Sequence, residues 1–87
     1  MSEPISSQPF RMLAASLRAS GFPAHGARLE AVLDGVWTTS TELLGELGQV
    51  VLAVRRDCRP LTAPQQDWVQ QCLREVRKAW PGFGWWR

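Results

Sequence analysis

One stretch of the chain, residues 39–58, constrains the fold more than any other because it repeats apolar residues with a single helical period. Its apolar positions alternate spacings of three and four residues: Leu44, Leu47, Val51, Val54 and Cys58. On a helix with about 3.6 residues per turn, this spacing places the side chains on one face. Thr39 and Glu42 form a capping-box pattern at its start. Arg55 and Arg56 lie near its end, where the helix dipole favours positive charge, so both ends agree on one long amphipathic helix.

Two glycines, Gly45 and Gly48, lie inside this predicted helix, away from its apolar stripe. Glycine inside a helix costs about 1 kcal/mol relative to alanine, so the pair suggests that another backbone approaches closely. The alternatives are local tolerance of glycine, or a turn at Gly48. The turn matters for function, because it would divide the stretch into a helix-turn-helix unit.

The rest of the chain predicts three further helices, which gives an all-α, four-helix domain. Residues 7–20 carry a narrow apolar stripe, and Gly21 follows where a left-handed residue often ends a helix. Pro23 suits the first turn of a second helix, which continues over residues 24–34. The fourth helix, residues 62–80, opens with a second capping-box pattern, Thr-x-x-Gln, and is ended by a Pro-Gly pair.

The short link between the third and fourth helices forces them into an antiparallel hairpin. In that register Val51 lies near Cys72, and Leu47 lies near Val76. Cys58 is then about two helical turns from Cys72, roughly 10 Å along the axis, whereas a disulfide needs Cα atoms within about 7 Å. We therefore expect both cysteines to be free, and we expect a shorter N-terminal helical pair to pack on this longer hairpin.

Length and composition limit the kinds of protein that this chain can form. Residues 8–82 are predicted to be a single domain, between a disordered N-terminus at residues 1–7 and an aromatic tail at residues 83–87. The net charge of +2 is too small to imply nucleic-acid or membrane binding by itself. No apolar run reaches the roughly 18 residues of a membrane helix, and the first residues lack a secretory-signal pattern. Two cysteines are too few for a disulfide framework, so we expect a cytoplasmic protein with reduced thiols.

The reactive side chains do not form a catalytic or metal-binding pattern. His25 is the single histidine, and Cys58 and Cys72 fall on apolar stripes, where free thiols are commonly buried. The glycine pair of the third helix lacks the strand and the lysine of a nucleotide-binding loop. Glu42 and Glu46 lie on a polar face, where we expect them to be solvated or paired with cations of the fourth helix. We therefore predict no enzyme activity, no cofactor, no metal and no small-molecule substrate.

Basic residues form two clusters on the predicted hairpin, one near each of its ends. The first cluster consists of Arg55, Arg56 and Arg59. The second cluster consists of Arg74, Arg77 and Lys78. The antiparallel register keeps the clusters apart and brings glutamates near the second, which makes a poor track for phosphates. The alternative function is nucleic-acid binding by a helix-turn-helix with its turn at Gly48 and the first cluster as its contact residues. Against it, the residues after Gly48 are too apolar for an exposed recognition helix.

The most unusual feature of the sequence is a tail with four large aromatic side chains within seven positions: Trp80, Phe83, Trp85 and Trp86. Tryptophan is enriched at binding hot spots because it buries a large area at a low entropic cost. Either the tail folds back to close the small core, or it contacts a partner or a second copy of the chain. We predict a non-enzymatic protein-interaction or small regulatory module. Its contact residues are predicted to be Phe83, Trp85, Trp86, Arg77 and Lys78.

Two segments of the sequence, STELLGELG and CLREVRKAWP, consist mostly of core-type positions: Leu43, Leu44, Leu47, Cys72, Leu73, Trp80 and Pro81. On these residues, and over roughly residues 29–81, the chain resembles short all-helical bacterial proteins of uncharacterised function. The resemblance implies a bacterial cytoplasmic domain with no assigned activity, and it transfers no catalytic residue to this chain.

Overall fold

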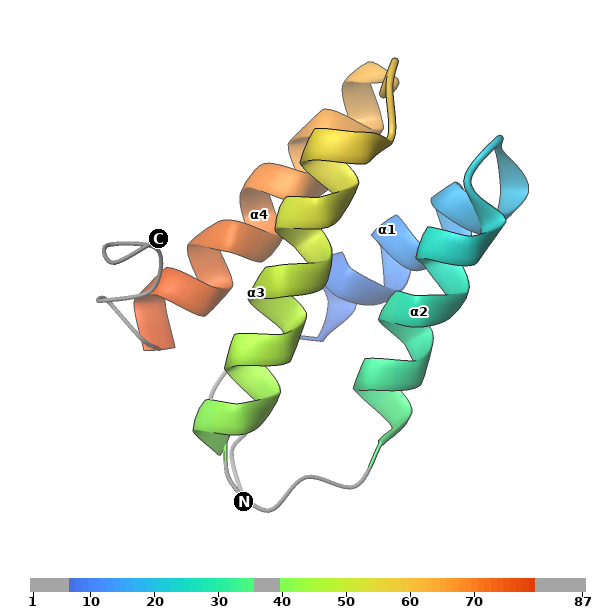
Figure 1. The fold of residues 1–87 in the computed structure, drawn as a ribbon. Coiled ribbons are helices and arrows are strands. Elements are labelled where there is room, and N and C mark those ends of the chain that lie inside the picture. The colour runs from blue at the N-terminus through green and yellow to red at the C-terminus, as the bar shows by residue number, and fades with distance from the viewer. Residues whose placement is uncertain (1–6, 36–39, 80–87) are drawn as a thin grey trace.

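The computed structural model describes residues 7–35 and 40–79, which form four α-helices (Figure 1). The helix bounds, in order from α1 to α4, are Gln8–Ala19, Pro23–Asp34, Ser40–Asp57 and Ala63–Ala79. No strand occurs within the two described ranges, so the prediction of an all-α, four-helix domain is confirmed. None of the described helices has the length and apolar character needed to cross a membrane. The predicted cap at Thr39 lies outside the described residues.

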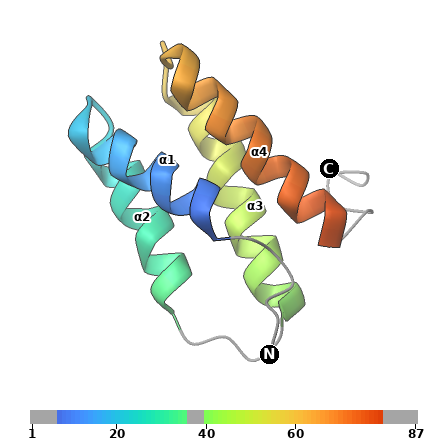
Figure 2. The same ribbon diagram turned by 180° about the vertical axis from the view of Figure 1, so that it is seen from behind.

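Each helix packs against two of the other three. α1 lies against α2 and α4, and α3 lies against the same two helices, so the contacts form a closed ring. Figure 2, seen from behind, shows α1 between α2 and α4. α1 and α2 have 12 residues each, whereas α3 and α4 have 18 and 17. The prediction that a short N-terminal pair packs on a longer C-terminal hairpin is therefore confirmed.

The core lies inside this ring and takes side chains from all four helices. The predicted apolar stripe of α3 is buried, together with the cysteine that follows the helix: Leu44, Leu47, Val50, Val51, Val54 and Cys58. The other three helices contribute Phe10, Leu13, Ala14, Leu17, Leu29, Val32, Val69, Cys72, Leu73 and Val76. Burying one leucine, valine or phenylalanine side chain stabilises a fold by about 1.5–3 kcal/mol. α3 therefore contributes more to the core than any other described helix.

Glycines mark two different features of the helices. α3 continues without a break through Gly45 and Gly48, so the alternative of a turn at Gly48 is wrong. A close helix approach that requires glycine occurs at Gly26 in α2. A Cβ atom added there would lie only 2.6 Å from the carbonyl oxygen of Ala14 in α1. Gly26 is buried, and its missing side chain lets α1 and α2 come together.

The C-terminal end of α1 and the N-terminal end of α4 meet at Gln65. The predicted capping box of α4 is present, because the backbone N–H of Gln65 donates to Thr62 Oγ1 at 3.2 Å and the N–H of Thr62 donates to Gln65 Oε1 at 3.0 Å. The Gln65 side chain also reaches Ser16 and Ser20 of α1. α1 ends at Ser20 in an extended conformation, and Gly21 does not adopt the left-handed conformation predicted for it.

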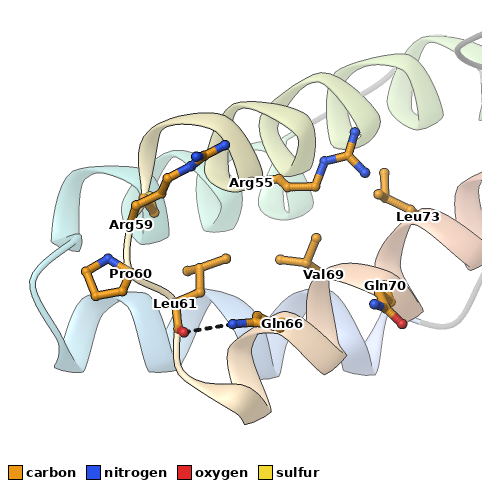
Figure 3. Close-up of a pocket in the computed structure, with 9 residues that line it drawn as sticks. Arg55, Arg59, Pro60, Leu61, Gln66, Val69, Gln70 and Leu73 are labelled. Atoms are coloured by element: carbon orange, nitrogen blue, oxygen red, sulfur yellow. Dashed lines mark hydrogen bonds between the residues drawn. The ribbon is translucent and has the colours of Figure 1, made fainter.

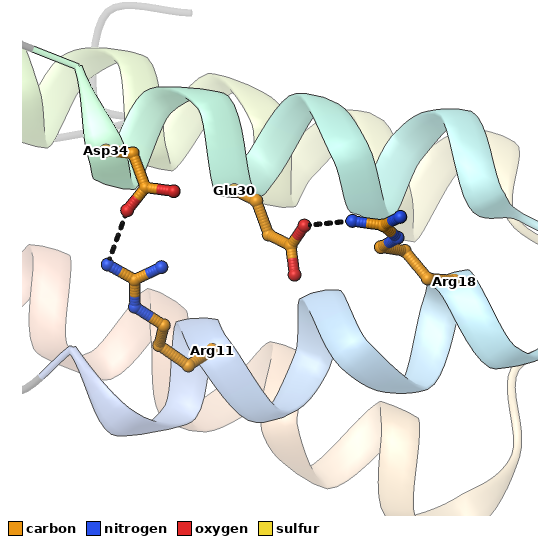
Figure 4. Close-up of polar contacts among 4 residues, drawn as sticks. All are labelled: Arg11, Arg18, Glu30 and Asp34. Carbon is orange, nitrogen blue, oxygen red and sulfur yellow. Dashed lines mark hydrogen bonds and ion pairs between the residues drawn. The ribbon is translucent and has the colours of Figure 1, made fainter.

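Ion pairs join α1 to α2 along their exposed edge (Figure 4). Arg11 Nη2 lies 2.8 Å from Asp34 Oδ1, and Arg18 pairs with Glu30 one turn earlier in α2. Exposed pairs of this kind stabilise a fold by only about 0–1 kcal/mol. Their main consequence is electrostatic, because two cations of the N-terminal pair of helices are neutralised within the fold.

Candidate functional site

A groove follows the outer side of the contact between α3 and α4. One face of α4 carries residues at helical spacings of four, three and four: Gln66, Gln70, Leu73 and Arg77. On α3, Leu52 and Arg55 are three residues apart, and Arg59 follows in the link to α4. These faces border the buried stripes of both helices. The apolar stems of the long side chains therefore rest near the core, while their polar ends reach the groove.

The first hollow of this groove has a volume of about 460 Å³ and lies beside the link that joins α3 to α4 (Figure 3). Its apolar lining comes from the link and from α4: Pro60, Leu61, Val69 and Leu73. Arg55 and Arg59 lie on the α3 side of the hollow, as Figure 3 shows. Gln66 Nε2 donates a hydrogen bond to the carbonyl oxygen of Leu61 at 3.0 Å. That bond holds the wall formed by the link against the first turns of α4.

The second hollow has a volume of about 530 Å³ and shares three lining residues with the first, namely Arg55, Gln70 and Leu73. Its other lining residues are cations of α4: Arg74, Arg77 and Lys78. The two hollows are therefore one continuous trough. We call it the basic groove, and it comprises Arg55, Cys58, Arg59, Pro60, Leu61, Gln66, Val69, Gln70, Leu73, Arg74, Arg77 and Lys78.

A shallower hollow of about 320 Å³ adjoins the basic groove on α3. It is lined by Leu52, Arg55, Arg56 and Arg59. No described carboxylate lines this hollow or either hollow of the basic groove. The charged side chains that line these hollows are therefore all positive, and they surround an apolar floor.

The cations around the basic groove differ in whether another group compensates them. Arg56 Nε lies 2.8 Å from Asp57 Oδ1, and this pairing holds the pKa of the Asp57 carboxyl below its usual value. Lys78 Nζ lies 3.4 Å from Glu75 Oε2, one turn earlier on α4. Four arginines have no hydrogen bond or ion pair with any other described residue: Arg55, Arg59, Arg74 and Arg77. The groove thus holds positive charge that the described fold does not neutralise.

The expected separation of the two basic clusters fails at Arg55, whereas Arg56 and Arg59 do not line the hollow that holds Arg74, Arg77 and Lys78. Arg55, from the first cluster, lines the same hollow as Arg74 and Arg77 from the second. Neutralisation of the second cluster by Glu46 is also not observed. Glu46 lies nine residues before Arg55, which is about two and a half helical turns, so the two side chains leave opposite sides of α3. Lys78 pairs with a glutamate of its own helix instead.

The predicted site residues fall into three groups. Three of them lie outside the described residues: Phe83, Trp85 and Trp86. Arg77 and Lys78, predicted as their neighbours, line one end of the basic groove. Arg55 and Arg59, predicted for the nucleic-acid alternative, line the other end. Arg56 lines only the adjoining hollow.

Sequence reasoning missed the uncharged part of the groove. Gln66 and Gln70 share the helical spacing of Leu73 and Arg77, and that spacing was the signal that could have placed all four on one face. The apolar lining from the link has no periodic signal, because Pro60 and Leu61 lie between the two helices and belong to neither apolar stripe.

The thiols near this site are poor nucleophiles. Cys58 borders the basic groove but has no exposed surface, and burial raises the pKa of its thiol. Burial raises the pKa of the Cys72 thiol to about 12. Both thiols are free and protonated at neutral pH, which bears out the prediction that they form no disulfide. Within the described ranges, no three His, Cys, Asp or Glu side chains are grouped so that they could hold a metal ion.

Comparisons with protein-family models, with curated proteins and with solved structures found no match to the chain. The basic groove must therefore be interpreted from its own residues, and the resemblance to short bacterial helical proteins stays a prediction.

Proposed function

We propose that the protein is a non-enzymatic interaction module that binds a protein partner through the basic groove. The observation that carries the proposal is the pairing of an apolar floor with four arginines that lack a described partner. Protein interfaces are built in this way, with a desolvated apolar centre and a polar rim, and arginine is enriched in them. A small regulatory role, in which the module occupies a site on its partner, is one form of this function.

The aromatic tail is the proposed continuation of the same contact surface. Its residues Phe83, Trp85 and Trp86 follow α4 in the sequence, and the last turn of α4 carries Arg77 and Lys78 of the basic groove. Aromatic anchors beside arginines are the usual composition of binding hot spots. Removal of residues 83–87 is therefore expected to weaken partner binding while the described core remains folded.

The proposal is tested by capturing partners from the source cell with the full-length protein and measuring the affinity of each by calorimetry. The groove variant is Arg55→Glu combined with Arg77→Glu. The matched control is Arg28→Glu, which reverses an exposed charge on α2 that has no described partner. We expect the groove variant to lose binding at least about tenfold, and the control to keep it. Partners that bind both variants equally well would rule out the groove as the binding site.

Nucleic-acid binding is the second candidate, and the observation in its favour is the group of four arginines that have no partner among the described residues. A helix-turn-helix centred on Gly48 does not support it, because α3 is continuous there. Any contact with phosphates would instead use the basic groove. Affinity for a random duplex that falls steeply between about 50 and 200 mM salt, and that is lost in the groove variant, is the result that would favour this candidate.

We also propose a cytoplasmic location in a bacterium. The free and buried thiols of Cys58 and Cys72 support a reducing compartment. The bacterial origin rests on the resemblance alone. Fractionation of source cells, with detection by an antibody against the protein, tests the location.

A further inference from the structure

We propose that the partner segment in the basic groove is an acidic amphipathic helix. Its apolar side chains would lie on the groove floor, and its carboxylates would lie beside the arginines that have no partner among the described residues. This inference rests on the proposed function, because it names the chemistry of the occupant of the same groove.

The length of the groove fits a short helix. Its α4 side extends from Gln66 to Lys78, which is about 18 Å at 1.5 Å per residue. A partner helix of about three turns covers that distance and presents apolar anchors at positions i, i+4 and i+7. The two hollows, of about 460 and 530 Å³, lie one after the other along this length. Each is large enough to receive one or more anchors, since binding pockets commonly have volumes of about 300–1,000 Å³.

The floor selects for apolar anchors. Val69 and Leu73 are each only 3% exposed and belong to the core, so the accessible apolar surface of the floor comes mostly from the exposed Pro60 and the half-buried Leu61. Two glutamines line the groove, and one of them, Gln66, already donates its side-chain amide to the carbonyl oxygen of Leu61. An occupant that places apolar side chains over Pro60 and Leu61 gains about 25 cal/mol for each Å² removed from water.

The rim selects for carboxylates. Arg55 and Arg59 stand on the α3 side of the floor, and Arg74 and Arg77 stand on the α4 side. Guanidinium groups bind carboxylates through two parallel hydrogen bonds, which is the strongest common contact of this type. Like charges gathered on one groove repel each other, and an anionic occupant removes that repulsion. Acidic residues on both flanks of an apolar stripe match this arrangement of two cationic rows and one apolar floor.

The same features favour a peptide over a nucleic acid. A phosphate backbone can use the arginines but gains nothing from Leu61, Val69 and Leu73. Single-stranded nucleic acid binds through aromatic stacking as well as charge, and no described aromatic side chain lines the basic groove. An amphipathic helix uses both the floor and the rim.

The inference is tested by selection from a displayed library of helical peptides, each about 16 residues long, in which the residue at every position is randomised. The full-length protein is the bait. We expect selected peptides to carry a net negative charge and apolar residues at i, i+4 and i+7. Fluorescence anisotropy then measures the Kd of a synthetic selected peptide and of its Glu→Gln analogue. We expect Arg55→Glu and the Glu→Gln analogue each to weaken binding at least about tenfold, and Arg28→Glu to change it less than about twofold.

Each other outcome overturns the inference in a recognisable way. Neutral or basic peptides that still require Arg55 would refute the acidic occupant but leave the groove as a binding site. Peptides that ignore Arg55→Glu, or the absence of any enrichment, would refute the inference and the proposed function together. A duplex of about 20 base pairs that binds more tightly than the selected peptide at about 150 mM salt would replace the peptide by nucleic acid. Thermal melts by circular dichroism establish that each variant is folded.

Discussion

The side-chain amide of Gln65 in α4 donates a hydrogen bond to the Oγ atom of Ser16 in α1 over a distance of 3.0 Å, across 49 positions of sequence. A second bond from the same nitrogen reaches Ser20 Oγ at 3.2 Å. Gln65 is 2% exposed, and no other polar side chain is buried in the described ranges. Because its oxygen also caps α4, one residue both starts a helix and fixes the position of that helix against α1.

The variant Gln65→Ala is expected to lose about 1–3 kcal/mol of unfolding free energy, because it removes the acceptor of the Thr62 backbone N–H and leaves the two serine hydroxyls without their donor. Urea unfolding followed by circular dichroism measures the change. The control is Gln71→Ala, at an exposed position of the same helix, which should stay within about 0.5 kcal/mol of the wild type. Equal losses in both variants would show that the hydrogen bonds to α1 add nothing.

Two glycine-to-alanine variants are expected to change stability in opposite directions. At Gly26 the new Cβ atom meets the backbone oxygen of Ala14 at 2.6 Å, and the helices must separate to relieve the contact. We expect Gly26→Ala to lose about 1–3 kcal/mol, despite the better helix propensity of alanine. At Gly21 nothing lies within 4 Å and the backbone is not left-handed, so Gly21→Ala should gain about 0.4–1 kcal/mol. Thermal melts of the two proteins under one buffer condition compare them, and a stabilising Gly26→Ala would contradict the close approach.

The local features of this fold were predictable from sequence because each depends on residues close together in the chain. The apolar stripe of α3 depends on spacings of three and four residues, and the Thr62–Gln65 capping box depends on residues three apart. The contacts of Gln65 with α1 and of Gly26 with Ala14 depend on how distant helices approach, and no spacing in the sequence encodes that distance.

The basic groove was only half predictable for the same reason. The sequence locates Arg55 and Arg77 on two helices of one hairpin, and the register along the hairpin axis keeps them apart. The structure adds the rotation of each helix about its own axis, which turns Arg55 toward the α4 side and Glu46 away from it. Without this rotation, the register alone pairs Glu46 with cations of α4 that lie on a different face of the hairpin. The structure therefore reveals a cationic surface that no described carboxylate lines, and the small net charge of the chain gives no sign of it.

Unfolding free energy is expected to fall as the pH rises above 9, because burial raises the pKa of the Cys72 thiol from its ordinary value of 9.0 to about 12. Below pH 9 the thiol is protonated in both states and contributes no pH dependence. Between these two values the unfolded chain releases the proton and the folded chain keeps it, so the unfolded state is favoured by about 1.4 kcal/mol per pH unit. Urea unfolding at pH 8 and pH 10 measures the change, and the wild type should lose about 1.4 kcal/mol more over this interval than Cys72→Ala, because the unfolded thiol is half ionised at pH 9. Identical slopes in the two proteins would contradict a buried, protonated thiol.

Removing charge from the basic groove should separate binding from stability. Arg55 and Arg77 are exposed and have no described partner, so replacing both by glutamine deletes no contact that holds the fold together. Their mutual repulsion with Arg59 and Arg74 is reduced, and we expect the unfolding free energy to stay within about 0.5 kcal/mol of the wild type or to rise slightly. Binding of an acidic helical peptide, measured by fluorescence anisotropy on the same samples, should fall at least about tenfold.

In the matched comparison, Arg11→Gln breaks the ion pair with Asp34 across α1 and α2, so it should reduce stability by up to about 1 kcal/mol and leave peptide affinity unchanged. If the double glutamine variant loses more stability than Arg11→Gln, the groove arginines support the fold. Their position around an apolar floor would then have a structural role and not a binding role.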